Sequence, residues 1–175
     1  MTDLSYPIGK FSPPDSMSAS DREAAIEVIR STPAQLREAV VGLTAEQLAI
    51  PYRPGGWTVR QLVHHVADSH MNAYLRYKLI ATQDHPTLVT YDQNRWAELG
   101  DVDAVPIEVS LQILDAIHLR WVAFLESLAA EDFDRTAYHP EMGDVKLSDM
   151  LAFYAWEGPH HVRHITALRE REGWD

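Results

Sequence analysis

The chain has 175 residues, a formal net charge of −11 and no cysteine. This length suits one domain with a sizeable core, and 46% hydrophobic and 23% charged residues are ordinary for a globular protein. The negative charge argues against a nucleic-acid partner, and the missing cysteines exclude disulfides, thiolate ligands and a cysteine nucleophile. Because neither a membrane-spanning apolar run nor a signal peptide is evident, we expect a cytoplasmic protein with no membrane contact.

The N-terminal residues predict an extended arm followed by a long helix. Residues 1–19 contain three prolines, several Ser and one Gly, a composition that disfavours a helix. Ser20 and Glu23 form a capping-box pattern, so we expect a helix from there to about Leu43, with a kink or restart at Pro33.

The middle of the chain predicts a short helix, a second long helix and a long connection. Thr44 is a suitable N-cap for the short helix. Thr58 with Gln61 forms another capping pattern, and the apolar spacing that follows continues to about Thr82. Residues 83–105 are expected to be a connection that includes one helical turn.

The C-terminal part predicts two more long helices. The third begins near Pro106, and its apolar positions recur at steps of four and three, which is typical of a bundle seam. Residues 132–146 are expected to be a loop, after which Ser148 caps a fourth helix that runs to about Arg171. The sequence therefore predicts an all-α four-helix bundle, a single domain over residues 1–175.

Six of the nine histidines lie in two short stretches, HHVADSH (64–70) and GPHHVRH (158–164). On a helix, His160 and His164 are four residues apart, and His161 and His164 are three apart, so spacing alone allows either pair to reach one metal ion. Helical rotation favours the first pair, because it places both rings on one face and turns His161 away from it.

On the second helix, His65 borders the apolar stripe and is the inward candidate. One histidine from this helix and two from the fourth would provide three neutral nitrogen ligands, with water as a fourth ligand, as in catalytic zinc sites. The competing interpretation is that these histidines are hydrogen-bonded core residues or surface residues.

Several other side chains are candidates for supporting roles. His118 lies in the seam of the third helix and is expected to be a core histidine rather than a partner of a metal ligand. Asp68 could orient His65 or be solvated, and Glu157 could act as a general base, although a surface position is favoured. Loop residues expected to line a pocket are Arg53, Tyr91 and Asn94, and loop histidines expected to be solvated are His85 and His139.

The stretch GGWTVRQLVHHVADSHMNAYLRYKL, together with LSYPIG, PYRPGGW, YDQNRWAEL, YHPE and HHVRHIT, resembles the YfiT branch of metal-dependent hydrolases in the DinB-like superfamily. The resemblance spans nearly the whole chain. It implies a DinB-like four-helix bundle, a cytoplasmic homodimer, and one zinc or nickel ion per subunit held by His65, His160 and His164. Relatives usually carry another polar residue in place of Pro159, a departure that bears on the straightness of the fourth helix.

The resemblance leaves three functions to compare. A divalent ion on three neutral histidines can activate water for hydrolysis of a small molecule. It can also deprotonate a low-molecular-weight thiol for transfer to an electrophile, the activity of the bacillithiol-transferase-like members, and the absence of cysteine suits this alternative. The third possibility is a protein that binds metal without catalysis.

Overall fold

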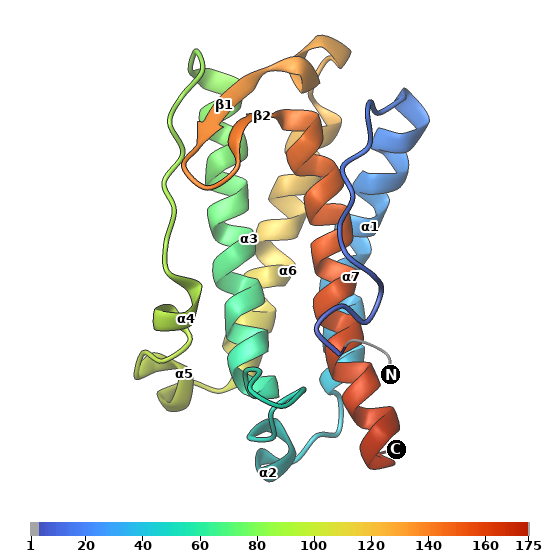
Figure 1. The fold of residues 1–175 in the computed structure, drawn as a ribbon, viewed down its shortest axis with the longest axis vertical. Helices are drawn as coiled ribbons and strands as arrows, with labels where there is room; N and C mark the ends of the chain where they lie inside the picture. The colour runs from blue at the N-terminus through green and yellow to red at the C-terminus, as the bar shows by residue number, and fades with distance from the viewer. Residues whose placement is uncertain (1–3, 175) are drawn as a thin grey trace.

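The computed structural model describes residues 4–174 and contains four long helices, as Figure 1 shows. They are α1 (Ala19–Val40), α3 (Val59–Thr82), α6 (Ile107–Glu126) and α7 (Leu147–Glu172). Helix α1 packs along α6 and α7, α3 packs along α6, and α3 meets α7 over a shorter seam. The expected all-α four-helix bundle is therefore confirmed.

Short elements fill the connections between the long helices. They are α2 (Ala45–Leu48), α4 (Gln93–Trp96), α5 (Asp101–Ala104), the 3-10 helix η1 (Ala130–Asp134), and the strands β1 (Thr136–His139) and β2 (Gly143–Lys146). The two strands form an antiparallel hairpin in which Ala137 pairs with Val145, and both of these side chains are buried. The expectation of a loop over residues 132–146 is wrong, because two apolar side chains and a positive φ at Gly143 are enough to form a short hairpin.

Two of the expected helix caps are displaced by two residues toward the N-terminus. Helix α1 is capped by Ser18, whose side chain accepts from the backbone N–H of Asp21, and not by Ser20. Ser148 does not cap α7, because the carboxylate of Asp149 accepts the backbone N–H of the residue before the helix instead. In both cases a nearby carboxylate competes for the unpaired N–H groups of the first turn.

Both helix-interior prolines lie in uninterrupted helices, Pro33 in α1 and Pro159 in α7. The two helices approach closely at Gly158. A Cβ atom at this glycine would lie 2.8 Å from both Cγ2 and Oγ1 of Thr32. The glycine therefore permits the close contact of α1 with α7 just before the C-terminal histidines.

The buried core consists of two apolar clusters. One surrounds Trp121, Tyr77 and Leu151, and the other surrounds Leu62, Leu114 and Ile165. Between the two clusters each long helix contributes at least one buried polar residue, and we call the four named next, one from each helix, the polar layer. Its members are Thr32, His70, His118 and Glu157.

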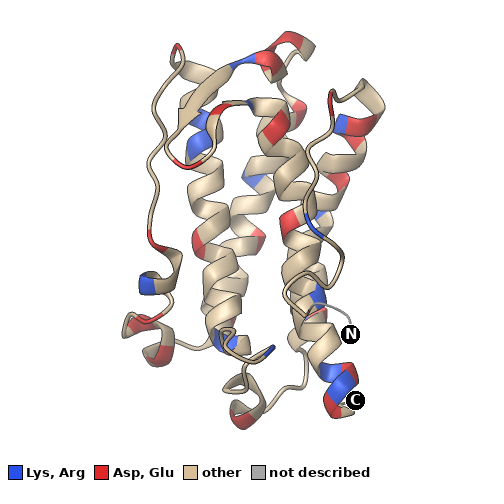
Figure 2. Cartoon of the chain, viewed as in Figure 1, with Lys and Arg blue, Asp and Glu red and all other residues tan. Residues whose placement is uncertain are grey.

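The segment before α1 follows the outer face of α7 (Figure 1). The indole N–H of Trp156 donates to the Gly9 carbonyl at 3.2 Å, and the Phe11 ring meets the Phe153 ring edge-on with centroids 5.4 Å apart. The arm is thus held beside the face of α7 that carries the histidines. Acidic and basic residues are interspersed over the outer elements (Figure 2), and no helix within residues 4–174 is long and apolar enough to cross a bilayer.

Candidate metal centre

A cavity of about 900 Å³ lies where α3 meets α7 over their shorter seam. Loops before α3 and α4, the β hairpin and the arm complete its walls. Residues lining it include Tyr6, Tyr52, Trp57, His65, Ser69, Arg76, His139, Phe153, Trp156, Glu157, His160, His161 and His164. Aromatic rings, histidines and a carboxylate thus surround one space, the composition expected of a small-molecule site.

His160 and His164 meet one turn apart on α7, as their spacing predicts. Their Nε2 atoms are 3.1 Å apart, close to the separation of ~3.3 Å between two nitrogens at ~2.0–2.1 Å from a tetrahedral zinc ion. The His160 ring stacks on Trp156 with centroids 4.4 Å apart, and the His164 ring lies 4.2 Å from that of Tyr52. The two nitrogens therefore converge as a pair of metal ligands would.

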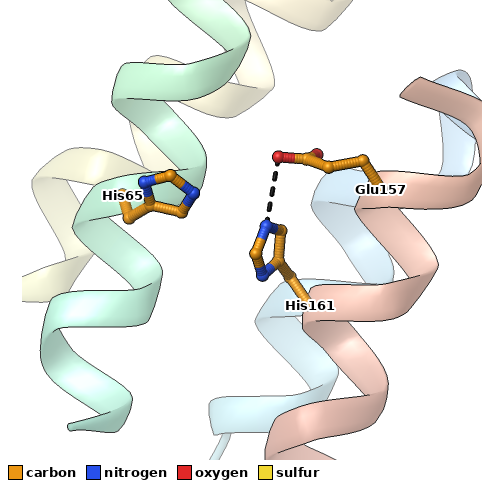
Figure 3. Close-up of side chains that lie close together, drawn as sticks. All are labelled: His65, Glu157 and His161. Atoms are coloured by element: carbon orange, nitrogen blue, oxygen red, sulfur yellow. Dashed lines mark hydrogen bonds and ion pairs between the residues drawn. The ribbon is translucent and has the colours of Figure 1, made fainter. Parts of the chain in front are cut away.

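His65 reaches the cavity from α3, where its ring lies 4.5 Å from that of Trp57 and 5.1 Å from that of His161. Figure 3 shows His65 facing His161 and Glu157 across the gap between the helices, and ligand atoms of these three residues all lie within 4.8 Å of one another. The expectation that His161 turns away from the site is wrong, because the face of α7 that points toward α3 also includes His161.

Burial keeps His65, His160 and His164 neutral. Burial, followed by the charges of neighbouring histidines, lowers the pKa of His65 to about 3, that of His160 to about 4 and that of His164 to about 3. A metal ligand must be a neutral imidazole. At neutral pH these rings are therefore already in the form that a divalent ion requires.

Glu157 is a buried residue, so the favoured expectation of a surface acid is wrong. Its Oε1 accepts from the Ser69 hydroxyl at 3.0 Å and contacts Nε2 of His161 at 3.1 Å, while Oε2 lies 2.7 Å from Nε2 of His70. Burial alone would raise the pKa of this carboxyl, but the charges and hydrogen bonds of His161 and His70 hold it well below its usual range. The spacing of four from Glu157 to His161 was the sequence signal for this contact.

The other candidates divide into cavity and non-cavity residues. Arg53, Tyr91 and Asn94 line the cavity as expected, although Asn94 lies in α4 rather than in a loop. His139 also lines it and is buried, contrary to the expectation that it is solvated, because the unforeseen hairpin carries it inward. His85 is exposed as expected, and Asp68 is half-buried outside the cavity lining.

His118 is buried in the core, as expected, and also connects to the site. Its Nε2 lies 2.7 Å from Nδ1 of His70, and its Nδ1 lies 2.7 Å from the Ile29 carbonyl oxygen. The sequence did not connect the two histidines, since nothing in the spacing of α3 and α6 indicates that the rings meet.

Comparison with known proteins gives consistent results. Residues 29–165 match the model of the DinB superfamily. A Bacillus cereus (strain B4264) protein provisionally named a metal-dependent hydrolase is 48% identical over 174 residues, covering 99% of this chain and all of the relative, and a Bacillus mycoides protein of the same name is equally similar. The solved structure of YfiT from Bacillus subtilis, described as a probable metal-dependent hydrolase with an unusual four-helix bundle topology, superposes with a TM-score of 0.95 at 44% identity over 98% of this chain and 99% of YfiT.

Proposed function

Because the chain belongs to the DinB superfamily and is 48% identical to proteins named as metal-dependent hydrolases, we propose that it is a divalent-metal-dependent enzyme acting on a small molecule in the α3–α7 cavity. The observation that carries the proposal is the pair of Nε2 atoms of His160 and His164, 3.1 Å apart at the cavity wall. His65, His160 and His164 are the proposed ligands, and zinc or nickel is the proposed ion.

Two of the three proposed ligands, His160 and His164, converge as such an ion requires, whereas the third, His65, faces His161 and Glu157. Nδ1 of His160 is buried without a hydrogen-bond partner, so its ring is held by packing on Trp156 and its Nε2 is the atom turned to His164. Glu157 is a poor competitor for the metal, because its oxygens already contact Ser69, His70 and His161. His161 directs Nε2 at Glu157 and keeps an unpartnered Nδ1, so the preference for His160 as a ligand rests on the 3.1 Å approach of its Nε2 to that of His164.

When bound, a divalent ion would lower the pKa of a coordinated water or thiol toward or below neutrality. The chain's own residues would bind and orient the substrate. Rings of Tyr52, Trp57 and Trp156 pack on the three proposed ligands and leave a largely aromatic wall for the organic part of a substrate. Arg53 at the cavity wall offers a cation to an anionic substituent.

Ligand variants test the metal site. We expect His65→Ala and His164→Ala each to abolish tight metal binding, because two imidazoles hold a divalent ion far more weakly than three. His161→Ala is the matched control and should retain metal. The measurement is elemental analysis of protein purified without a nickel column. Stoichiometric metal in His164→Ala, or loss of metal from His161→Ala, would contradict this ligand set.

Hydrolysis is the first activity to test, and thiol transfer is the second. Two observations favour keeping the second, the absence of cysteine and a cavity of about 900 Å³ that can hold two small molecules. In the transfer, a thiol loses its proton, its sulfur bonds to an electrophilic carbon, and a leaving group such as chloride departs. Metal-dependent cleavage of p-nitrophenyl acetate without thiol supports the hydrolase. Conjugation of chlorodinitrobenzene that requires both thiol and metal supports the transferase.

The assembly and location follow the family resemblance. We propose a homodimer that works in the cytoplasm, with no nucleic-acid partner. Sedimentation of the purified chain tests the first part, since a monomer at micromolar concentration would contradict it.

A further inference from the structure

Two arginines line the α3–α7 cavity, and neither forms an ion pair within residues 4–174. Arg53 lies at the histidine end, beside the Tyr52 ring that packs on His164. Arg76 follows His65 on α3 at a rise of ~16 Å along the helix axis. Arg76 is therefore a cation at the opposite end of the cavity, toward the β hairpin (Figure 1).

The three carboxylates of the cavity wall leave Arg76 unpaired. Asp92 accepts two backbone N–H groups as the N-cap of α4, and Glu157 already contacts three side chains. Glu141, the third, is exposed and forms no ion pair with Arg76. In a chain of net charge −11, a cation that stays unpaired beside a cavity favours an anionic ligand.

Neutral groups hold the Arg76 guanidinium in one position. Nε and Nη2 donate to the Val89 carbonyl at 3.2 and 2.8 Å, and Nη1 donates to the Tyr154 hydroxyl at 3.4 Å. The guanidinium also lies 6.0 Å from the ring centroid of Tyr91. Because a guanidinium has five N–H groups, one on each terminal nitrogen remains for a ligand. Two donors at one fixed place match the two oxygens of a carboxylate.

His139 supplies another donor on the same wall. Its Nδ1 accepts the backbone N–H of Glu141 at 3.2 Å, so the ring carries its proton on Nε2, which has no hydrogen-bond partner in the described part of the chain. Burial, followed by the charge of Arg76, lowers the pKa of His139, so the ring is neutral at neutral pH. One positive charge with several free N–H groups suits a carboxylate better than a doubly charged phosphate.

A wall of rings connects this end of the cavity to the proposed metal ligands. Its members, in order, are Tyr154, Phe153, Trp156 and His160, all of which line the cavity. Successive ring centroids are 5.2, 6.0 and 4.4 Å apart. A long apolar or aromatic molecule fits along such a wall, with one end at Arg76 and the other at the histidines.

We propose that Arg76, assisted by His139, is a specificity-determining residue that binds the carboxylate of an elongated organic acid whose other end reaches the histidines. The assignment of this acid as the substrate rests on the proposed function, whereas the binding of its carboxylate does not. An arginine that only fastened residues 83–92 to α3 would affect charged and neutral ligands equally, and this difference provides the test.

Biphenyl-4-carboxylate and biphenyl-4-carboxamide are rigid probes of nearly the same shape that differ in charge. We expect the full chain, freed of metal with a chelator, to bind the carboxylate about 10-fold more tightly in equilibrium dialysis at neutral pH, because hydrogen bonds to charged groups contribute more than neutral ones. Arg76→Gln should remove this preference and leave the affinity for the carboxamide within about twofold of the parent.

Arg135→Gln is the matched control. Arg135 also donates to backbone carbonyls, those of Ile80 and Gln83, but it does not line the cavity, so this variant should keep the parental preference. A parent that does not prefer the carboxylate would overturn the proposal, as would an equal loss of both affinities in Arg76→Gln. Loss of the preference in Arg53→Gln and not in Arg76→Gln would also overturn it, because the carboxylate would then bind at the histidine end.

Arg76→Lys replaces Arg76→Gln if the latter fails to fold, as judged by its far-ultraviolet spectrum. Lysine keeps the charge but cannot present two N–H groups in one plane, so the preference for the carboxylate should decrease without disappearing. An unchanged preference in Arg76→Lys would contradict the two-donor site and overturn the proposal.

Two esters test the link to catalysis, mono-4-nitrophenyl suberate and its neutral methyl ester. With zinc bound, Arg76→Gln should raise KM for the charged ester about 10-fold and change neither its kcat nor the KM of the neutral ester. Zinc-dependent cleavage in which Arg76→Gln changes KM equally for both esters would overturn this proposal and leave the metal enzyme standing. Absence of any cleavage in a chain that prefers the biphenyl carboxylate through Arg76 would support the carboxylate site and contradict the metal enzyme.

Discussion

Burial shifts the pKa of individual side chains in the bundle. It lowers the pKa of histidines and raises that of acids, and in both cases it favours the neutral form. It lowers the pKa of His65 and His164 to about 3, which leaves them neutral, and raises that of the half-buried Asp68 to about 6. Metal binding at the histidines should consequently meet little competition from protons down to about pH 5, whereas exposed histidines with a pKa near ~6.5 would already be charged there.

Asp68 offers a test of this control by stability. Burial, followed by the charge of Asp101, raises its pKa, so the folded state prefers the protonated acid. The associated stability is present below the unfolded pKa of ~3.9 and is lost as the pH rises through about 6. Asp68→Asn stays neutral and should raise the free energy of unfolding by about 1 kcal/mol at pH 8, after allowance for solvent screening, and by little near pH 4.

Urea denaturation of both chains at the two pH values measures this difference. An equal gain at both values would indicate that the substitution acts through something other than charge.

At the scale of elements, the site depends on the contact of α1 with α7. Gly158 lets α1 approach just before the histidine stretch, and Thr32 fills the space where a side chain would stand. Glu157 directly precedes Gly158, and the histidine stretch follows it. The positions of these side chains therefore depend on this helix crossing. A proline at the next position does not interrupt the helix, so the spacing of His160 and His164 is preserved.

Gly158→Ala should be destabilising despite the higher helix propensity of alanine. Its Cβ would lie 2.8 Å from Thr32 Cγ2, so we expect a loss of about 1–3 kcal/mol from overpacking. Thr32→Ala removes both crowded atoms, and the double variant should recover most of the loss. Thermal unfolding of the four chains forms a double-mutant cycle, and strictly additive effects would exclude the contact as the cause.

Elements were predictable where local chemistry decides them and less so where packing does. Thr58 and Gln61 fixed the start of α3 because the capping bonds are made within one turn. The hairpin escaped prediction because four-residue strands carry little periodic signal. Likewise, the pairing of His160 with His164 follows from helix geometry, whereas the burial of Glu157 depends on how α3 packs against α7, which sequence spacing does not encode.

For the whole molecule, the two apolar clusters predict that the fold does not depend on a metal. Both clusters include side chains from all four long helices and neither includes a proposed ligand. We therefore expect removal of the ion with a chelator to leave the far-ultraviolet helical signal nearly unchanged and to lower the melting temperature only by the amount that ligand release accounts for. Collapse of the helical signal would instead identify a structural metal, for which binding and folding are one event.

The polar layer between these clusters is not what selection for the stability of the fold alone would favour. A four-helix bundle can close its interior with leucine and isoleucine at every level, and replacing buried charged networks with matched apolar side chains is often neutral or stabilising. Four positions in the middle of this core are filled by Thr32, His70, His118 and Glu157 instead. Replacing this layer with apolar side chains would therefore be a natural first step toward a more heat-resistant protein. The resulting bundle would be more stable, but its cavity would lose the hydrogen bonds that connect it to the opposite side of the fold.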